Sequence, residues 1–224
     1  MSKGRRTSAL PLWYESRSGV FALIYTIGFL GGWALSAATG HAYVPAFRAI
    51  AQQYGAEGTT AAAAALGCIA LAFAIRLWGS SYLSEERVWS RDARVDALVI
   101  AGPFRYCRHP LYAANIALAL GLGSLAPVWG WMFIVIAHLF FVRALISREE
   151  RSLAARYKAE YAEYRRRVPA LVPRFLPVPQ SAGGVRPDCH QGLRTESFSL
   201  FVIAGVASFF VVPRYGWWIL AGAY

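Results

Sequence analysis

Residues 111–142 read LYAANIALALGLGSLAPVWGWMFIVIAHLFFV, a run of 32 residues with no Asp, Glu, Lys or Arg. About 20 apolar residues are enough for one helix to cross a bilayer, so this run is too long for one span and suits two short ones. Gly121, Gly123, Pro127 and Gly130 favour a break near its middle. We therefore expect a hairpin of two membrane helices that turns near Pro127.

Three further runs lack charged residues, namely 20–39, 59–75 and 197–212. Arg76 and Trp78 follow the second run, as residues that anchor a span at the membrane interface commonly do. Together with the hairpin, these runs predict an all-α, polytopic transmembrane protein of about five spans. The alternative is that one or two of the runs, 197–212 above all, are helices buried in a protein core.

The composition of the chain favours the membrane. Of its 224 residues, 57% are hydrophobic and 16% are charged, whereas a soluble domain carries about 25% charged residues. The net charge is +11, and with a cytoplasmic N-terminus five spans place every Lys and Arg except Arg48 and Arg214 on the cytoplasmic side. Topology and contact with anionic lipids therefore explain the basic charge, and nucleic-acid binding is not expected. Alanine and arginine far outnumber isoleucine and lysine, which indicates a GC-rich bacterial genome and hence a bacterial inner membrane.

The segment GPFRYCRHPLY, residues 102–112, leads into the hairpin. Its Gly-Pro start predicts a turn, and Pro110 suits the first turn of the next helix, where no amide donor is lost. Arg105, Arg108 and His109 are thereby expected at the membrane boundary, at a helix N-terminus that attracts anions. The alternative is that these residues only anchor the helix in the lipid headgroups.

Glu149 and Glu150 lie just past the hairpin, at the start of a segment, 147–167, whose composition predicts a helix. Because a hairpin returns to the side from which it left, we expect both carboxylates to approach Arg108 and His109. Carboxylates and basic groups that meet at the membrane boundary form a polar pocket, and such residues are functional candidates.

Other polar residues have simpler interpretations. Glu160 and Glu163 are spaced to pair with the residues at 164–167 on a solvated helix face. His138 is expected in a packed helix interface. The three cysteines share no short spacing, and Cys189-His190 is too little for a metal site, so neither a disulfide framework nor a metal site is expected.

The segment 102–112, the pair Glu149-Glu150 and the Tyr-rich sequence YKAEYAEYRRRVP at 157–169 together resemble the isoprenylcysteine carboxyl methyltransferase family and the related phospholipid methyltransferases. The resemblance extends over residues 98–173. Membrane sterol reductases that use NADPH carry a motif similar to the Arg-His-Pro-x-Tyr part, whereas the Glu pair and the Tyr-rich helix are more specific to the methyltransferases.

The resemblance implies an integral membrane enzyme that binds S-adenosylmethionine in a cytoplasmic pocket. It implies that Arg108 and Arg167 act near the substrate as catalytic residues. The cofactor contacts that it implies are His109, Pro110, Tyr112, Glu149 and Glu150. This chain continues well beyond Pro173, where typical members end, and residues 180–196 either cap the pocket or link it to the last run. We expect three parts, namely residues 1–79 with two spans, the methyltransferase core 80–179, and the additional segment 180–224.

The chemistry of the cofactor extends this set of candidates. Arg105 or His109 can bind its carboxylate, Glu149 or Glu150 can accept from its ammonium or ribose, and Tyr106 or Tyr112 can stack on its adenine. Gly102, at the turn, completes the candidate cofactor-binding residues.

The acceptor determines whether a base is needed. An ionised carboxylate needs only positioning, for which Arg108 and Arg167 suffice, whereas an amine must lose a proton and would need Glu150 as the base. Carboxyl transfer is favoured, but the residues leave both open. We expect a lipid or another lipophilic small acceptor, such as a small thiol or an isoprenoid acid, because a pocket at the helix ends is open to lipid. An NADPH-dependent reductase and a non-catalytic scaffold or transporter subunit are the alternatives, and the oligomeric state is not predicted.

Overall fold

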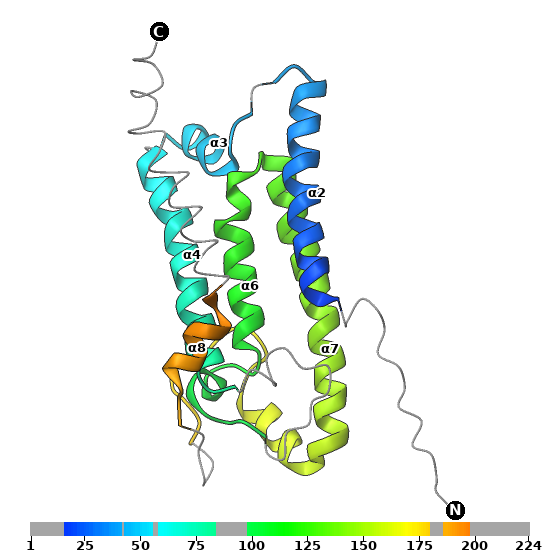
Figure 1. Ribbon diagram of the computed structural model, residues 1–224, viewed down its shortest axis with the longest axis vertical. Coiled ribbons are helices and arrows are strands. Elements are labelled where there is room, and N and C mark those ends of the chain that lie inside the picture. Colours follow the sequence, from blue (N-terminus) through cyan, green and yellow to red (C-terminus); the bar gives the residue numbers. More distant parts are fainter. Residues whose placement is uncertain (1–15, 42, 56–57, 84–97, 180–185, 198–224) are drawn as a thin grey trace, which may run out of the picture.

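The computed structural model describes residues 16–41, 43–55, 58–83, 98–179 and 186–197, and these residues are all-helical apart from one isolated bridge. The helices are α2 (Arg17–Ala38), α3 (Ala46–Gln53), α4 (Gly58–Ser80), η1 (Gly102–Arg105), α6 (Pro110–Gly121), η2 (Gly123–Leu125), α7 (Val128–Arg167) and α8 (Cys189–Thr195). In Figure 1, α2, α4, α6 and α7 run side by side, with α3 at one end of the bundle and α8 beside the other end of α4. The all-α prediction is confirmed.

Three of these helices, α2, α4 and α7, are long and apolar enough to cross a membrane, and residues Pro110–Leu125 form a shorter apolar helix. The runs 20–39, 59–75 and 111–142 are therefore helical as predicted, and we treat their uncharged parts as the membrane-spanning segments. The fifth candidate span, 197–212, lies outside the described residues except for Ser197.

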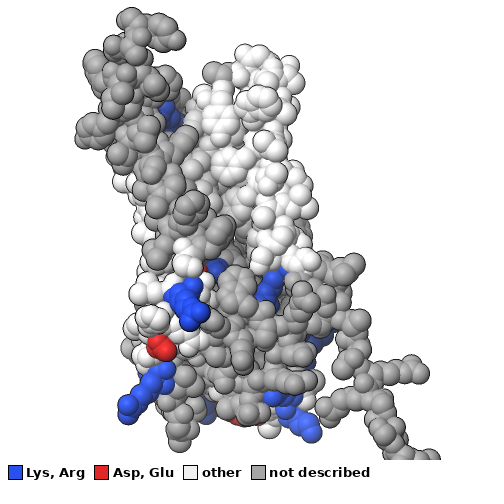
Figure 2. All heavy atoms as spheres, in the orientation of Figure 1, with Lys and Arg blue, Asp and Glu red and all other residues white. Residues whose placement is uncertain are grey.

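The surface of the described bundle has an apolar part and a charged end. Figure 2 shows Lys and Arg gathered at the lower end of the molecule, below a surface of uncharged residues. Many large apolar side chains of the membrane helices are exposed, including Leu30, Trp33, Leu71, Trp129 and Phe140. Exposed apolar surface of this extent suits lipid rather than water as the surrounding medium.

The hairpin turns near Pro127, as predicted from the sequence. Pro127 is the N-cap residue of α7. The segment that leads into α3 is hydrogen-bonded to this turn. The Ala46 amide donates to the Ala126 carbonyl at 2.8 Å, and the Tyr43 hydroxyl donates to the Leu125 carbonyl at 2.6 Å.

Glycines bring the helices close together in pairs. A Cβ atom on Gly130 of α7 would lie 2.2 Å from the carbonyl oxygen of Gly28 in α2, and one on Gly121 of α6 would lie 2.7 Å from that of Ala65 in α4. Small residues of this kind let membrane helices pack backbone against backbone. Consistent with this, α2 packs against α7 and α4 packs against α6.

The helix α7 contains the helix predicted over residues 147–167 as its second part. It continues from the membrane span to Tyr157, because no glycine or proline ends it after Gly130. It breaks instead at Lys158, where φ is 43° and ψ is −112°. Beyond the break, Tyr161 and Tyr164 pack in a small core. We call residues 128–157 and 159–167 the long and short limbs of α7.

The segment that contains α8 docks on the end of α4. The buried Glu196 carboxylate accepts from Arg76 Nε at 2.7 Å and from Ser80 Oγ at 2.8 Å. Arg76 Nη1 also donates to Asn115 of α6 at 2.7 Å. Residues 188–196 therefore form part of the described bundle, and neither α8 nor α3 was predicted from the sequence.

Candidate active site

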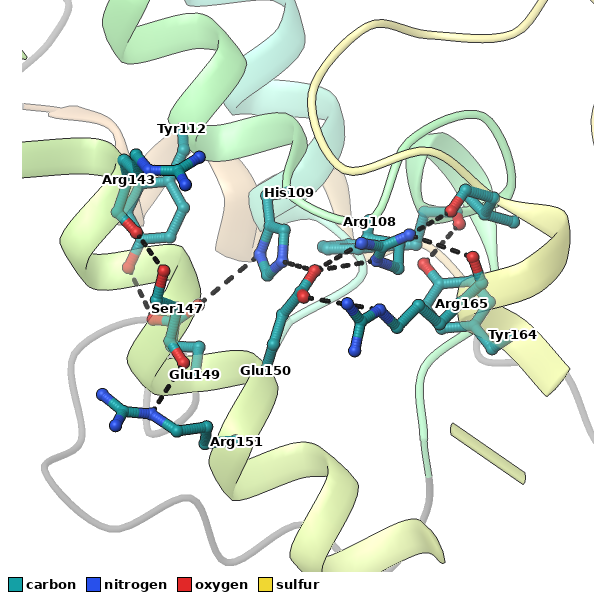
Figure 3. A network of polar contacts seen from close by, with 12 residues as sticks. Arg108, His109, Tyr112, Arg143, Ser147, Glu149, Glu150, Arg151, Tyr164 and Arg165 are labelled. Atoms are coloured by element: carbon teal, nitrogen blue, oxygen red, sulfur yellow. Dashed lines mark hydrogen bonds and ion pairs between the residues drawn. The ribbon is translucent and has the colours of Figure 1, made fainter. Parts of the chain in front are cut away.

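The turn before α6 has a backbone that requires glycine. Gly102 has a φ of 52°, and a Cβ atom there would lie 2.4 Å from the ring of Tyr82. Pro110 then begins α6, and His109 occupies the N-cap position without using its side chain to cap the helix. The imidazole of His109 is buried and points instead toward α7 (Figure 3).

Arg108 joins this turn to both limbs of α7 (Figure 3). Its Nε and Nη2 donate to Glu150 Oε1 at 3.0 and 2.5 Å. Its Nη1 donates to the carbonyl of Arg165 at 3.2 Å and to that of Val168. Only 9% of the Arg108 side chain is exposed. Arg108 therefore holds the turn against α7 as well as placing a positive charge beside Glu150.

His109, Tyr112 and Glu149 extend the network toward the membrane. His109 Nε2 lies 3.3 Å from Glu150 Oε1, and its Nδ1 lies 3.7 Å from Glu149 Oε2. The Tyr112 hydroxyl donates to Glu149 Oε1 at 2.5 Å, and Arg17 Nη1 lies 3.9 Å from the same oxygen. The hairpin therefore brings Arg108, His109 and Tyr112 together with the two glutamates.

The chain after α7 holds the backbone of the turn. Four hydrogen bonds join the two segments like a short irregular ladder. They run from the amides of Arg108, His109, Arg174 and Val178 to the carbonyls of Pro169, Ala170, Tyr106 and Arg105 respectively. Residues 105–109 are thereby held on one side by residues 169–178 and on the other by α7.

Three groups at the site have pKa values shifted by their surroundings. Hydrogen bonds from His109 and then from Arg108 hold the pKa of Glu150 at about 2, although partial burial opposes this shift. Burial raises the pKa of Tyr161 to about 12, and the Glu150 charge raises it further. Burial also raises the pKa of the Cys107 thiol to about 11. At neutral pH Glu150 is thus a carboxylate and a weak base, and the other two groups are neutral.

A cavity lies beside Glu150, between the two limbs of α7. It has a volume of about 480 Å³ and is lined by Ser147, Glu150, Arg151, Ala154 and Arg165. Pockets for small ligands usually fall between about 300 and 1,000 Å³. Its lining offers one carboxylate and two guanidinium groups. Within the described ranges, no group of three or more His, Cys, Asp or Glu side chains could hold a metal ion.

Three of the residues predicted for the site point elsewhere. Arg167 pairs with Glu163 one helical turn away, Nε to Oε1 2.5 Å, and its side chain is 59% exposed. Arg105 Nε donates to the carbonyl of Val178 at 2.7 Å. The Tyr106 ring packs on Trp78, with ring centroids 5.7 Å apart. The surface pairing expected for Glu163 is confirmed.

Arg165, rather than Arg167, faces Glu150. Its Nε lies 3.8 Å from Glu150 Oε2. Residues two positions apart on an α-helix are separated by about 200° of rotation around the helix axis, so the side chains of Arg165 and Arg167 point in nearly opposite directions. Sequence reasoning missed Arg165, since choosing among adjacent arginines requires the orientation of the short limb. It also missed Arg17, whose approach to Glu149 depends on how α2 packs against α7.

The fold and the site define a polytopic helical membrane protein with a charged pocket at one end of the bundle. Residues 60–160, slightly less than half of the chain, match the sequence profile of the family described as phospholipid methyltransferase. This segment contains the turn, the hairpin and both glutamates. The resemblance seen in the sequence is thereby confirmed.

Three curated proteins are similar to parts of the chain. The chain is 36% identical over 108 residues to the cobalt-zinc-cadmium resistance protein CzcN of Cupriavidus metallidurans, covering 48% of this chain and 46% of that protein. It is 32% identical over 100 residues to the nickel-cobalt-cadmium resistance protein NccN of Alcaligenes xylosoxydans xylosoxydans, covering 45% and 44%. It is 38% identical over 76 residues to methanethiol S-methyltransferase 2 of Bradyrhizobium diazoefficiens, covering 31% and 29%. The match thus spans less than half the length of each relative, and no solved structure matches the chain.

Proposed function

We propose that the protein is an S-adenosylmethionine-dependent membrane methyltransferase that acts on a lipophilic or small acceptor at the charged end of the bundle. The observation that carries this proposal is the partly buried network of Arg108, His109, Tyr112, Glu149 and Glu150, which lies inside the matched segment. We place this end in the cytoplasm, because the basic residues of the described bundle gather there.

The groups around the cavity suit the polar parts of the cofactor. Glu149 is 27% exposed and, beyond its bond with Tyr112, has acceptor capacity for an ammonium or a ribose hydroxyl. Arg151 and Arg165 line the cavity beside Glu150 and offer donors to a carboxylate. Charge-assisted bonds of this kind contribute about 1.5–3 kcal/mol each. The bound cofactor would supply a methyl group for in-line displacement, for which the chain provides alignment and partial exclusion of water.

The protonation state of Glu150 bears on the acceptor. A carboxylate with a pKa of about 2 is a poor base for an ammonium headgroup, since efficient proton transfer needs a pKa nearer the working pH. This favours an acceptor whose nucleophile is already ionised at neutral pH, as a carboxylate is, or is ionised in small part and intrinsically very nucleophilic, as a thiol is. One relative bears the name methanethiol S-methyltransferase 2, which supports including thiols among the candidates.

Calorimetry on the full chain in detergent tests the proposal. We expect S-adenosylhomocysteine to bind and NADPH not to bind. The double variant Arg108→Ala/Glu150→Ala should abolish binding, whereas Glu163→Gln, which changes only a surface pair, should leave it intact. Glu149→Gln, a milder change, should weaken binding without unfolding the protein.

The proposal fails if NADPH binds in place of S-adenosylhomocysteine, or if the double variant binds as tightly as the wild type. Methyl transfer to prenylcysteine analogues, phosphatidylethanolamine and short-chain thiols then identifies the acceptor. Turnover of phosphatidylethanolamine alone would contradict our preference for an ionised nucleophile.

A further inference from the structure

The segment that follows α7 carries an unusual group of apolar side chains. Val172, Phe175 and Leu176 are 78%, 102% and 74% exposed. These residues belong to the segment 169–178 that is hydrogen-bonded to the turn before α6. Contiguous apolar surface in a loop marks a contact with a membrane or another molecule more often than with water.

The position of the neighbouring Leu171 gives the depth of this loop. Leu171 packs against a cluster that contains Val142 of α7 and includes Phe21 of α2 and Phe141 of α7 at its edge. These three residues lie in the uncharged parts of their helices. The loop therefore begins at the level where the membrane-spanning segments reach the charged end of the bundle.

The charges beside the loop suit a lipid surface. Arg174 lies between the apolar residues, and its Nη1 donates to the carbonyl of Arg167 at 2.8 Å. Arg165, Arg166 and Arg167 have side chains that are 61%, 76% and 59% exposed. Apolar residues next to clustered arginines are typical of segments that lie in the membrane interface and attract anionic headgroups.

Few backbone amides of the loop depend on water for a hydrogen bond. Pro173 and Pro177 have no amide hydrogen. The amides of Arg174 and Val178 donate to carbonyls of the turn. Fewer backbone donors are thus left to be satisfied by water, which lowers the cost of moving the loop toward lipid.

We propose that residues 172–176 insert into the lipid interface, with Val172, Phe175 and Leu176 among the headgroups and upper acyl chains and Arg174 on anionic headgroups. Because the same segment holds the amides of Arg108 and His109, insertion fixes the candidate active site at the depth from which a lipophilic acceptor arrives. The insertion stands independently of the proposed methyltransferase activity, whereas its link to the acceptor rests on that activity.

Spin-label accessibility on the full chain tests the insertion. The chain is reconstituted in vesicles of phosphatidylcholine and phosphatidylglycerol, with the partly buried Cys68 and the exposed Cys189 replaced by serine. Labels are placed at Phe175→Cys, at Phe140→Cys on the apolar exposed part of α7 as the lipid reference, and at Glu160→Cys as the water reference. Collision with oxygen is compared with collision with a water-soluble nickel complex.

We expect the label at 175 to prefer oxygen, as the label at 140 does. A preference for the nickel complex, as at 160, overturns the proposal. A label shielded from both reagents overturns it as well, because protein rather than lipid would then cover the loop.

The link to the acceptor needs a kinetic measurement. Phe175→Ser, which leaves the hydrogen-bonded network untouched, should raise KM for a long-chain acceptor about tenfold. It should leave KM for a short-chain acceptor and the affinity for S-adenosylhomocysteine unchanged. If the variant and the wild type have equal KM values for the long-chain acceptor, the link to the acceptor is refuted, while the spin-label result still stands. If S-adenosylhomocysteine does not bind the wild type, the proposed function is refuted instead.

Discussion

Replacing Glu150 by glutamine should destabilise the protein in a way that depends on pH. The variant keeps the shape of the side chain and one acceptor oxygen, but it removes the charge that faces Arg108, His109 and Arg165. Arg108 is only 9% exposed on its side chain. It would therefore keep its positive charge with no carboxylate against it, which is costly in a poorly solvated place.

The magnitude follows from the pKa of Glu150, which is about 2 in the folded chain against an ordinary value of 4.5. A difference of about 2.5 units corresponds to about 3 kcal/mol. Access of solvent to the pair reduces this to on the order of 2 kcal/mol. Because the folded pKa is the lower one, this contribution is complete above the unfolded pKa of about 4.5 and is lost as the pH falls toward 2.

The assay is unfolding of the full chain in detergent, wild type against Glu150→Gln, from pH 7 down to pH 2.5. At pH 7 we expect the variant to unfold at a temperature about 4–8 °C lower, with the difference shrinking below about pH 4.5. Glu163→Gln is the matched control, since its carboxylate is 37% exposed and pairs with exposed arginines, and it should cost less than about 0.5 kcal/mol. A gap that stays constant from pH 7 to pH 2.5, or one no larger than that of the control, would refute the assignment of Glu150 as a buried partner of Arg108.

Three other changes test the rest of the structure. Gly28→Leu should lower the unfolding temperature by several degrees because a Cβ atom there would lie 2.3 Å from a side chain of α7, whereas Gly31→Leu, with nothing within 4 Å, should not change it. Glu196→Ala should cost about 3 kcal/mol by leaving the partly buried Arg76 without its carboxylate partner, and the double variant with Arg76→Ala should recover part of that loss in a double-mutant cycle. Tyr112→Phe removes a hydrogen bond to Glu149, so it should weaken S-adenosylhomocysteine binding about tenfold by calorimetry and lower the unfolding temperature by a few degrees at most.

The hairpin was predictable because its signal is local. A bilayer sets the length of each span, and the uncharged run 111–142 with Pro127 near its middle allows few other arrangements. The same reasoning placed Arg108 and His109 near Glu149 and Glu150, and the structure brings these residues into contact. In a membrane protein, side chains in loops on opposite sides of the bilayer cannot pair. Knowing the side on which each loop lies therefore excludes most of the possible partners of a charged residue.

The break in α7 was not predictable in the same way. Lys158 has neither the sequence of a turn nor a neighbouring glycine or proline, and its positive φ is uncommon for such a residue. The short limb is held there by tertiary contacts, since Tyr161 and Tyr164 pack with Leu98 and Val168. The orientation of this limb decides that Arg165, and not Arg167, faces Glu150.

Arg76 shows where reasoning from topology ends. The sequence indicated an interface anchor, which is the usual role of an arginine at the end of a span. In the structure it binds Glu196, 120 residues further along the chain, together with Ser80 and Asn115. The pairing of Arg108 with Glu150 across the hairpin follows from one turn and the lengths of two spans. The contact between Arg76 and Glu196 depends on the path of all the elements that lie between these two residues. Ion pairs at the end of a membrane bundle can therefore be predicted from sequence where a single hairpin separates the partners, and they require coordinates where several elements intervene.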